Sequence, residues 1–316
     1  MNILLLGGFG FIGTNILKYV ETLDSDYRMI VFDRFPNHLD NIKFSRVDKV
    51  YAGDFSDEYL LNKIFTENHI DVVLHSLSAS VPSSSVDNIF DLKFNVIPTI
   101  TLLNVMKTHD VRNIVFISSG GAVYGDNTIK GNGHSEGDVL FPKSAYGVSK
   151  LVIEKYLYLY STLYDFKVLI TRLSNPYGPY HYSQKQGVVN IALEKAMRGE
   201  ELEIWGDGNG CKDYIYIDDF CRVLFDLICK GFVSYTVLNI GSGCLLSVNE
   251  IADIIRKKFY PHFKTTHINI NNLDVNSFKL DLSKLYSIVG DMKLTTFEDG
   301  LDKTKKWYDT KNEGLI

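Results

Sequence analysis

Cysteine is scarce in this 316-residue chain: it has four, all in the second half, and no two form a C-x-x-C pair. This spacing argues against a disulfide framework and against a cysteine zinc site, so we expect reduced thiols and no metal. An excess of basic residues is also missing, because the net charge is -5 with both signs mixed along the chain. Nucleic acid is therefore excluded as a partner. The cysteines are Cys211, Cys221, Cys229 and Cys244.

Signals for export or membrane insertion are lacking as well. The apolar start has no basic region before it and is interrupted by glycines, unlike a secretory signal peptide. No stretch is expected to reach the length of a membrane span. We therefore expect a cytoplasmic protein without a membrane partner, whose hydrophobic content of 45% can build a nucleotide-binding domain and a smaller second domain.

The most informative stretch lies at the start of the chain. Ile3–Leu6 is a continuous apolar run, typical of a parallel strand buried on both faces. A glycine turn follows directly. Gly7 permits the tight turn, Gly10 lets the backbone approach a pyrophosphate, and Gly13 lets the next helix pack closely on the strand. Strand, turn and helix in this register predict a dinucleotide site, whereas the glycines alone would indicate only a turn.

An acidic residue follows this strand, turn and helix at the end of the second strand. Met29–Asp33 reads as a second buried strand, and Asp33 stands about twenty residues beyond the turn, where it would bond the ribose hydroxyls of NAD. Arg34 could receive the 2′-phosphate of NADP, but Asp33 would repel that phosphate. NAD is therefore favoured over NADP.

The third and fourth strands are expected at Val50–Phe55 and Asp71–His75, with a helix from about Glu58 to Asn68 between them. Asp54 has two interpretations, an acceptor for the adenine amino group or an acid flanking the helix. The small residues of the loop Ser76–Ser80 would let the chain pass close beneath a cofactor.

Helical periodicity predicts a helix over Asp87–His109, interrupted by Asn95, which is either solvated or able to reach the nicotinamide end of a cofactor. A fifth strand, Val111–Ile117, leads into Ser118 and Ser119. Hydroxyls at the carboxyl end of a central strand lie where open α/β sheets bind ligands.

A helix over Ala145–Tyr164 carries Tyr146 and Lys150, four residues apart and hence on one face. A free tyrosine is a weak base at neutral pH, but a nearby ammonium favours the phenolate. Tyr146, Lys150 and a serine hydroxyl could therefore move a proton to and from a substrate oxygen. By itself, such a pair could also be incidental to an amphipathic helix.

Together these residues resemble the extended short-chain dehydrogenases/reductases. Three further motifs are similar to the NAD-dependent nucleotide-sugar epimerases and dehydratases, typified by UDP-glucose 4-epimerase: RLSNPYGP at 172–179, IWGDG at 204–208 and DYIYIDD at 213–219. The resemblance extends to about Tyr308. It implies an α/β fold, a Rossmann doubly wound parallel sheet with a smaller C-terminal α/β substrate domain.

The resemblance also implies site residues. Tyr146 would be the catalytic acid/base with Lys150 as its partner, and Ser119 or Ser118 would polarise the sugar oxygen. The implied NAD-binding residues are Gly7, Gly10, Phe11, Ile12, Gly13, Asp33, Arg34, Asp54, Phe55, Ser76, Ser78, Asn95, Ser118, Tyr146, Lys150 and Pro176. The implied substrate-binding residues are Ser80, Ser119, Tyr146, Asn175, Val189, Trp205, Lys212 and Tyr214.

The chain departs from the family pattern in two ways. The usual catalytic serine or threonine, four residues before the tyrosine of the V-Y-G segment, is replaced by Gly120. Lys212 stands where the first of two diphosphate-binding arginines is common, and no arginine occurs near the second position at Asn271–Val275. A lysine offers a point charge without the bidentate fork of arginine.

The family resemblance also limits which reaction the chain could catalyse. A 4,6-dehydratase needs an acidic pair after its catalytic hydroxyl, and Gly121 and Ala122 cannot transfer protons. The cysteine of the reductase-epimerases is also missing there. We therefore predict a UDP-hexose type 4-epimerase that oxidises C4 transiently. The alternatives are an NAD(P)H-dependent reductase of a 4-keto-6-deoxy nucleotide sugar, and a catalytically silent nucleotide-sugar-binding protein.

The predicted organisation is an NAD-binding domain at 1–175, with a returning segment near 213–240, and a mainly substrate-binding domain at 176–316. The family usually dimerises through the helices predicted at Asp87–His109 and Ala145–Tyr164. The tyrosine-rich face of the second helix suits an aromatic interface, although it could also be intramolecular core. A homodimer is therefore expected.

Overall fold

The computed structural model describes residues 1–35, 43–80, 88–125, 133–231, 234–269 and 277–312. The chain divides into two compact units, which are described separately. Unit 1 comprises Met1–Ser119, Ser144–Arg172 and Cys221–Leu238, and unit 2 comprises Gly120–Lys143, Leu173–Phe220 and Asn239–Ile316. The predicted domains, NAD-binding at 1–175 with a returning segment near 213–240 and mainly substrate-binding at 176–316, remain predictions.

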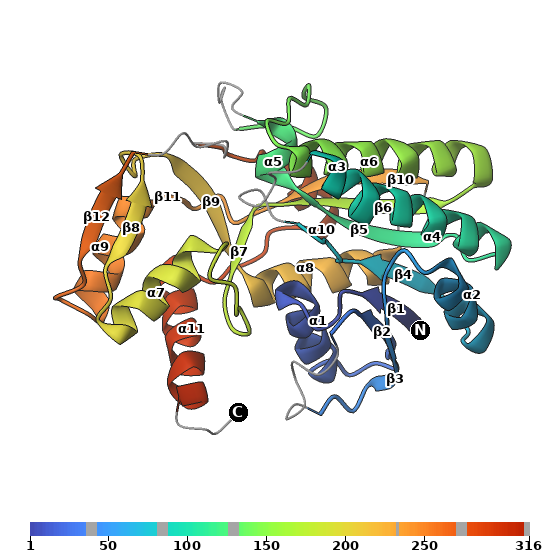
Figure 1. Ribbon diagram of the computed structural model, residues 1–316, viewed down its shortest axis with the longest axis horizontal. Coiled ribbons are helices and arrows are strands. Elements are labelled where there is room, and N and C mark those ends of the chain that lie inside the picture. The colour runs from blue at the N-terminus through green and yellow to red at the C-terminus, as the bar shows by residue number, and fades with distance from the viewer. Residues whose placement is uncertain (36–42, 81–87, 126–132, 232–233, 270–276, 313–316) are drawn as a thin grey trace. The chain divides into compact units, whose positions relative to one another are not determined.

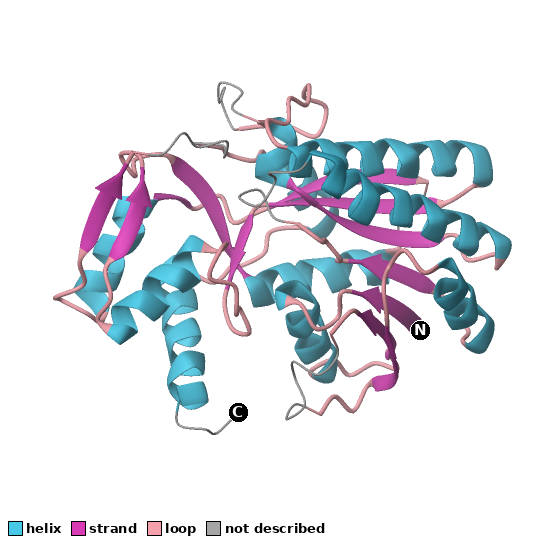
Figure 2. Ribbon diagram, viewed as in Figure 1, coloured by secondary structure: helices cyan, strands magenta, loops and turns pink. Residues whose placement is uncertain are grey.

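Unit 1 holds most of a seven-stranded sheet and the helices that flank it (Figures 1 and 2). Its elements are β1 (Asn2–Leu6), α1 (Phe11–Glu21), β2 (Arg28–Asp33), β3 (Val47–Ala52), α2 (Glu58–Glu67), β4 (Val72–His75), α3 (Asn88–Asp91), the π-helix η3 (Leu92–Val96), α4 (Ile97–Thr108), β5 (Asn113–Ser119), α6 (Ala145–Tyr164), β6 (Lys167–Leu173), α8 (Ile217–Lys230) and β10 (Tyr235–Ile240). The last residues of β6 and β10 and the first turn of α8 fall in unit 2.

The strand order is β10-β6-β5-β4-β1-β2-β3. β1 pairs in parallel with β2 on one side and with β4 on the other, so the order reverses beside β1. This is the doubly wound order of a Rossmann fold extended by a seventh strand, and ligands bind such sheets at the carboxyl ends of the strands where the order reverses. The predicted fold class is confirmed, and β10 joins the sheet at its edge beside β6.

Local sequence accounts for the helix starts. The side chain of Asp57 accepts from the backbone N–H of Leu60 at 3.0 Å and caps α2, and Ser144 caps α6 through the N–H of Gly147 at 3.2 Å. Each bond satisfies a backbone donor that the first helical turn leaves without an intrahelical partner. Both helices therefore begin where the sequence predicted.

The helix expected at Asp87–His109 is not continuous. Asp87 lies outside the described residues, and from Asn88 the chain runs through α3, the π turn η3 and then α4. Periodicity predicted one regular helix because a single π turn adds only one residue to the pattern. Asn95 lies in this turn and is only 5% exposed, so it is not solvated.

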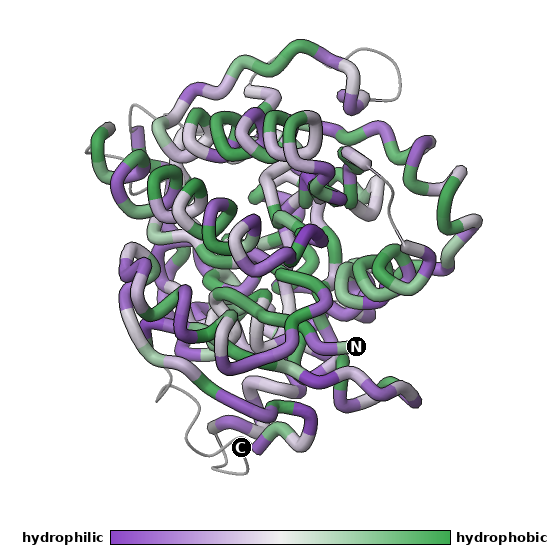
Figure 3. The backbone as a smooth tube through the Cα atoms, turned by 90° about the vertical axis from the view of Figure 1, so that its right-hand side faces the viewer, coloured by the Kyte–Doolittle hydropathy of each residue, from purple (hydrophilic) through white to green (hydrophobic). Residues whose placement is uncertain are grey.

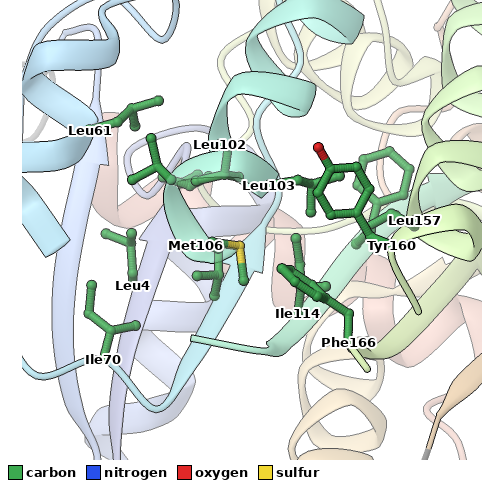
Figure 4. Packing of buried hydrophobic residues seen from close by; sticks show 14 of the residues in the cluster. Leu4, Leu61, Ile70, Leu102, Leu103, Met106, Ile114, Leu157, Tyr160 and Phe166 are labelled. Atoms are coloured by element: carbon green, nitrogen blue, oxygen red, sulfur yellow. The ribbon is translucent and has the colours of Figure 1, made fainter. Parts of the chain in front are cut away.

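Apolar side chains of α4 form the centre of the core of unit 1. Figure 4 shows Leu102, Leu103 and Met106 between Leu61 of α2 and Leu157 of α6. All five are fully buried, and burial of an aliphatic side chain of this size contributes roughly 1.5–3 kcal/mol. The hydropathy colouring shows the matching alternation of hydrophobic and hydrophilic bands along the helices (Figure 3).

One helical stretch, Ile89–Thr108, is long and apolar enough to cross a membrane by length and hydropathy, which corrects the expectation that no stretch would be. Half of its most apolar window is buried inside the protein. That burial is what a helix covering a sheet requires.

Unit 2 contains shorter elements in two small sheets, one of order β11-β9-β7 and one of order β12-β8. Its apolar core is formed mainly by α7, α9 and α11 with the strands they cover. The elements are α5 (Gly120–Tyr124), β7 (Asn175–Tyr177), α7 (Val188–Arg198), β8 (Leu202–Trp205), β9 (Cys211–Tyr216), β11 (Leu245–Ser247), α9 (Val248–Lys258), β12 (Thr265–Ile268), α10 (Ser283–Val289) and α11 (Phe297–Asn312).

Candidate functional site

The glycine turn joins β1 to α1 as the sequence predicted. Gly7 has φ +78°, and its N–H donates to the carbonyl of Phe32 at 2.8 Å. A Cβ at Gly13 would lie 2.1 Å from the carbonyl oxygen of Gly7, so only glycine lets the helix approach the turn. A Cβ at Gly10 would meet nothing closer than 3.5 Å. The backbone at Gly10 is therefore open to a ligand, as the pyrophosphate of NAD requires.

Asp33 ends β2 beside this turn. Its carboxylate accepts from the N–H of Phe9 at 2.9 Å and from the N–H of Phe35 at 3.2 Å. These bonds orient the carboxylate and leave each oxygen a further lone pair for a ribose hydroxyl. Phe11 and Ile12, the first residues of α1, are partly exposed. The turn therefore fits the pyrophosphate, and this acid fits the ribose, of an adenosine diphosphate.

Arg34 does not stand free to receive a 2′-phosphate, because its Nη2 lies 2.5 Å from Oδ2 of Asp54. The other oxygen of Asp54 accepts from the N–H of Ser56 at 2.9 Å and from its hydroxyl at 2.6 Å. These bonds from Ser56 chiefly, and the charge of Arg34 after them, hold the pKa of Asp54 below its usual value. The pair supports the preference for NAD over NADP.

We expect Asp33→Asn to weaken NAD binding about tenfold, because one charge-assisted acceptor for the ribose hydroxyls is lost. Asp33→Asn combined with Asp54→Asn should also raise affinity for NADP, because the double variant removes the repulsion and releases Arg34. Calorimetric titration of dinucleotide-free protein with NAD and with NADP measures both effects. Asp48→Asn, an exposed acid paired with Arg28, is the matched control. An unchanged ratio of the two affinities in the double variant would contradict this account.

Three other predicted cofactor residues lie along the same sheet edge. Ser76 donates to the carbonyl of Leu6 at 2.8 Å, and Ser78 donates to the carbonyl of Ser80 at 2.9 Å. The ring of Phe55 is 6% exposed and packs on His75, so its side chain belongs to the core rather than to a cofactor surface. Only the backbone of Phe55 is left for a contact with NAD.

His75 is a buried packing residue. Its Nε2 lies 3.0 Å from the hydroxyl of Thr99, and its ring packs edge-on against Phe55 and Phe116. Burial, with the positive charge of Lys150 as a smaller cause, lowers the pKa of His75 to about 3. The imidazole is therefore neutral at physiological pH.

Asn95 and Ser80 belong to a buried polar cluster around Asp91. The carboxylate of Asp91 accepts from the Ser80 hydroxyl and from Nδ2 of Asn95, the latter at 2.9 Å. Oδ1 of Asn95 accepts from the N–H of Ala79 at 2.8 Å. Sequence reasoning missed Asp91, although an acid four residues before an asparagine in an otherwise apolar helix was a usable signal.

Tyr146 and Lys150 lie together on α6, and Ser119 at the end of β5 hydrogen-bonds the Tyr146 side chain. Nζ of Lys150 donates to the carbonyl of Ile117 at 3.0 Å and lies 5.7 Å from the centroid of the Tyr146 ring. Burial chiefly, and the charge of Asp91 after it, raises the pKa of Tyr146 to about 12, while the bond from Ser119 opposes this. Burial lowers the pKa of Lys150 to about 8. Without a ligand, the phenol therefore keeps its proton at neutral pH.

Ser118 points elsewhere. Its hydroxyl donates to Oε1 of Glu154 at 2.6 Å, and Glu154 pairs with Arg172, whose Nη2 lies 2.8 Å from Oε2. All three side chains are at most 4% exposed. In the structure Ser119 therefore contacts the tyrosine, and Ser118 contacts a buried ion pair. The sequence alone did not distinguish the roles of the two serines.

Gly120 and Gly121 begin α5 in unit 2 and are backed by apolar side chains. A Cβ at Gly120 would lie 2.9 Å from Cδ1 of Leu280, and one at Gly121 would lie 2.7 Å from the ring of Phe278. Side chains longer than glycine would have to displace these neighbours. Little room is therefore left at Gly120 for the hydroxyl residue that the family usually has there, or at Gly121 for a dehydratase acid.

The predicted substrate residues of unit 2 fall into two groups. Trp205 at the end of β8 is 47% exposed, and Asn175 on β7 donates to the carbonyl of Asp213 at 3.1 Å. Val189 and Tyr214 are buried in the apolar core of the unit, so their side chains are not presented to a ligand. The exposure of Trp205 favours a role in stacking on a ligand over a role in filling the apolar core.

Four further positions complete the account. Lys212 is half-buried on β9 and Pro176 half-buried on β7. Tyr177 and His181, in the stretch that follows Asn175, are 1% and 6% exposed and belong to the interior. The stretch Asn271–Val275, where the family commonly has its second arginine, lies outside the described residues.

Known proteins that resemble this chain in sequence and in structure are nucleotide-sugar epimerases and dehydratases. The model of the NAD dependent epimerase/dehydratase family matches residues 3–241. A putative UDP-glucose 4-epimerase of Methanocaldococcus jannaschii is 32% identical, covering 98% of this chain and 99% of its own. A dTDP-glucose 4,6-dehydratase of Haemophilus influenzae is 28% identical, covering 98% of both chains. The crystal structure of a UDP-glucose 4-epimerase with UDP-glucose from Thermotoga maritima is 31% identical, with a TM-score of 0.89 over 99% of this chain and 100% of its own.

Proposed function

The chain belongs to the NAD-dependent epimerase/dehydratase family, and on that premise we propose that it is a nucleotide-sugar 4-epimerase of the UDP-hexose type. The observation that carries the proposal is the group of Tyr146, Ser119 and Lys150, combined with the absence of an acid at Gly121 and Ala122. This group can move one proton at one sugar oxygen. It lacks the second acid that dehydration needs at those positions.

The proposed roles follow from the geometry. Tyr146 would take the proton of the C4 hydroxyl and later return it, while Ser119 holds the same oxygen by a hydrogen bond. Lys150 would stabilise the phenolate by its charge, since a cation close to a phenol lowers its pKa. NAD, when bound, supplies the acceptor and donor of the C4 hydride, so that a 4-keto sugar forms and is reduced on its other face. Gly7, Gly10, Gly13 and Asp33 would hold NAD.

Unit 2 would bind the nucleotide part of the substrate. We propose that Trp205 stacks on the base and that Asn175 and Lys212 contact the diphosphate side. The preference for UDP over other nucleotides is part of this proposal. A cytoplasmic location remains our prediction.

Identifying the dinucleotide that is released on denaturation tests the proposal, together with incubation of the native protein with UDP- and dTDP-hexoses without added cofactor. Stoichiometric NAD and conversion of one sugar to its C4 epimer are expected. Activity only on a 4-keto sugar with added NADH or NADPH would replace the epimerase by the reductase. Turnover in neither assay would favour a silent binding protein.

We also propose a homodimer, formed through α3, α4 and α6. Exposed apolar side chains gather on these helices, with Ile97 56%, Leu163 58% and Tyr158 54% exposed. We expect the double variant Ile97→Glu/Leu163→Glu to sediment as a monomer. Each substitution would place a charged side chain in the apolar interface of the dimer. Tyr59→Glu on α2, at an 80% exposed residue, should leave the dimer intact. A wild-type protein that sediments as a monomer would exclude the dimer.

A further inference from the structure

A buried ion pair that the proposed proton transfer does not use lies near Lys150. Glu154 is four residues beyond Lys150 on α6, and Arg172 is on β6, which neighbours β5 in the sheet. Nε and Nη2 of Arg172 donate to the two oxygens of the Glu154 carboxylate at 3.2 Å and 2.8 Å. Glu154 is 1% exposed and Arg172 is 4% exposed. The pair is thus shielded from solvent in the interior of unit 1.

The surroundings of Glu154 on α6 are apolar. Ile153 and Leu157, which flank it on the helix, are both buried in the core of unit 1. Taking two charges out of water costs about as much free energy as their attraction returns, so apolar side chains of similar volume would stabilise this core as well. An ion pair does add a fixed geometry, because its atoms meet at set distances and angles. The presence of Glu154 in this core therefore indicates a requirement for position.

Three consecutive residues at the end of β5 are held by α6. The carbonyl oxygen of Ile117 accepts from Nζ of Lys150 at 3.0 Å. The hydroxyl of Ser118 donates to Oε1 of Glu154 at 2.6 Å. The next residue, Ser119, hydrogen-bonds the side chain of the proposed catalytic tyrosine. The helix residues that make these contacts are spaced four apart, so they lie along one face of α6.

Glu154 also connects α6 to more than one strand. Its carboxylate accepts from Ser118 on β5 and from Arg172 on β6. Its backbone carbonyl accepts from the hydroxyl of Tyr235 on β10 at 3.4 Å. β10, β6 and β5 are successive strands at this edge of the sheet. A single residue of α6 is therefore bonded to three neighbouring strands.

We propose that Glu154 is a positioning residue that acts through the hydroxyl of Ser118. Bonded to Ser118 on β5 and to Arg172 on β6, it sets the position of α6 along the sheet. That position brings Lys150 and the proposed catalytic tyrosine to the end of β5, where a displacement of about 1 Å can lower a rate by up to about 10²-fold. The part of the proposal that concerns turnover rests on the proposed epimerase function. Glu154 itself transfers no proton.

Ser118→Ala tests the proposal, because it removes the bond to β5 and keeps the ion pair of Glu154 with Arg172. We expect kcat for C4 epimerisation to fall about tenfold, because the reacting groups are displaced. KM should stay within about twofold, because the residues proposed to bind the nucleotide belong to unit 2 and are unchanged. Ser118→Thr keeps a hydroxyl on the same Cβ and should restore most of kcat.

Glu154→Asp separates the reach of the side chain from its charge. Aspartate keeps the negative charge for Arg172 but is one methylene shorter, so it cannot reach both Arg172 and Ser118 from the same helix position. We expect a loss of kcat of about the same size as in Ser118→Ala.

Tyr160→Phe is the matched control. It also removes one side-chain hydrogen bond from α6, but this bond, of 2.7 Å, goes to Asn104 on α4 and not to the sheet. Its kcat should stay within about twofold of that of the wild-type protein. A general loosening of α6 would lower the rate in this variant as well.

The last measurement does not need turnover. Crystal structures of the wild-type protein and of Ser118→Ala, both without ligand, give the distance from Nζ of Lys150 to the carbonyl oxygen of Ile117, which is 3.0 Å here. We expect this distance to lengthen in the variant beyond the range of a hydrogen bond, about 3.5 Å. If the protein epimerises no sugar, this distance still tests the inference separately from the function.

Four outcomes would overturn the proposal. They are an unchanged distance in Ser118→Ala, full activity of that variant, no recovery of kcat in Ser118→Thr, and a loss of kcat in Tyr160→Phe equal to that in Ser118→Ala.

Discussion

Tyr146→Phe is expected to lower kcat for C4 epimerisation by about 10³-fold, because positioned acid/base groups contribute factors of that order. The substitution removes one hydroxyl and keeps the ring above which Nζ of Lys150 lies, at 5.7 Å from its centroid. The hydrogen bond to Ser119 is lost, but the packing of α6 is retained. Bound dinucleotide and the free energy of unfolding should therefore change little.

The measurement is a rate comparison under saturating substrate, with the NAD content of each preparation determined after denaturation. Tyr158→Phe is the matched control: it lies on the same helix, is 54% exposed and packs edge-on against Tyr235. Its rate should stay within twofold of the full chain, a change of less than about 0.4 kcal/mol in barrier. Retention of more than a tenth of the activity by Tyr146→Phe would remove the tyrosine from its proposed role.

Much of unit 1 could be predicted because its strands carry a strong signal. Ile3–Leu6 and Met29–Phe32 are apolar on both faces, so their composition predicts that helices bury them from each side. The glycine spacing then locates the turn between β1 and α1. The short strands β8 and β12, with four residues each, have too little periodicity to be recognised without their partner.

The site was predicted less completely, because it depends on which neighbours fold beside a residue. Ser118 and Ser119 are equivalent in the sequence. In the structure Ser118 hydrogen-bonds Glu154, which pairs with Arg172, whereas Ser119 hydrogen-bonds Tyr146. The effect of burial on Tyr146 is another example. The sequence suggested a pKa lowered by Lys150, whereas burial and Asp91 raise it to about 12. Burial in the folded protein has a larger effect on the pKa of Tyr146 than the nearby charge of Lys150. The four-residue spacing of Tyr146 and Lys150 does not reveal that burial.

Gly13→Ala should lower the stability of the protein, whereas Gly10→Ala should lower only its affinity for NAD, although both remove a glycine from the same turn. A Cβ at Gly13 would lie 2.1 Å from the carbonyl oxygen of Gly7 and 2.6 Å from Cα of Gly8, and neither backbone atom can move without opening the turn. Gly13→Ala should therefore destabilise the dinucleotide-free protein by roughly 3 kcal/mol. Loss of NAD binding would follow from the distorted turn.

Gly10 is different because its conformation, with φ -73° and ψ 176°, suits any residue, and a Cβ there meets only the Gly7 oxygen at 3.5 Å. Gly10→Ala should leave the dinucleotide-free protein as stable as before or more stable by about 0.5 kcal/mol, since alanine restricts the unfolded chain. Its affinity for NAD should fall at least about tenfold, because the methyl group occupies the approach of the pyrophosphate.

Urea unfolding of stripped protein and titration with NAD distinguish the two variants. Gly137→Ala, where a Cβ would meet nothing within 4 Å, is the control and should change neither quantity. Normal NAD binding by Gly10→Ala would show that the pyrophosphate does not lie against this turn. Full stability of Gly13→Ala would show that α1 can shift away from β1 at little cost. The predicted pattern, with stability lost at one glycine and affinity alone lost at the other, requires both the close packing of α1 on the turn and a ligand phosphate at Gly10.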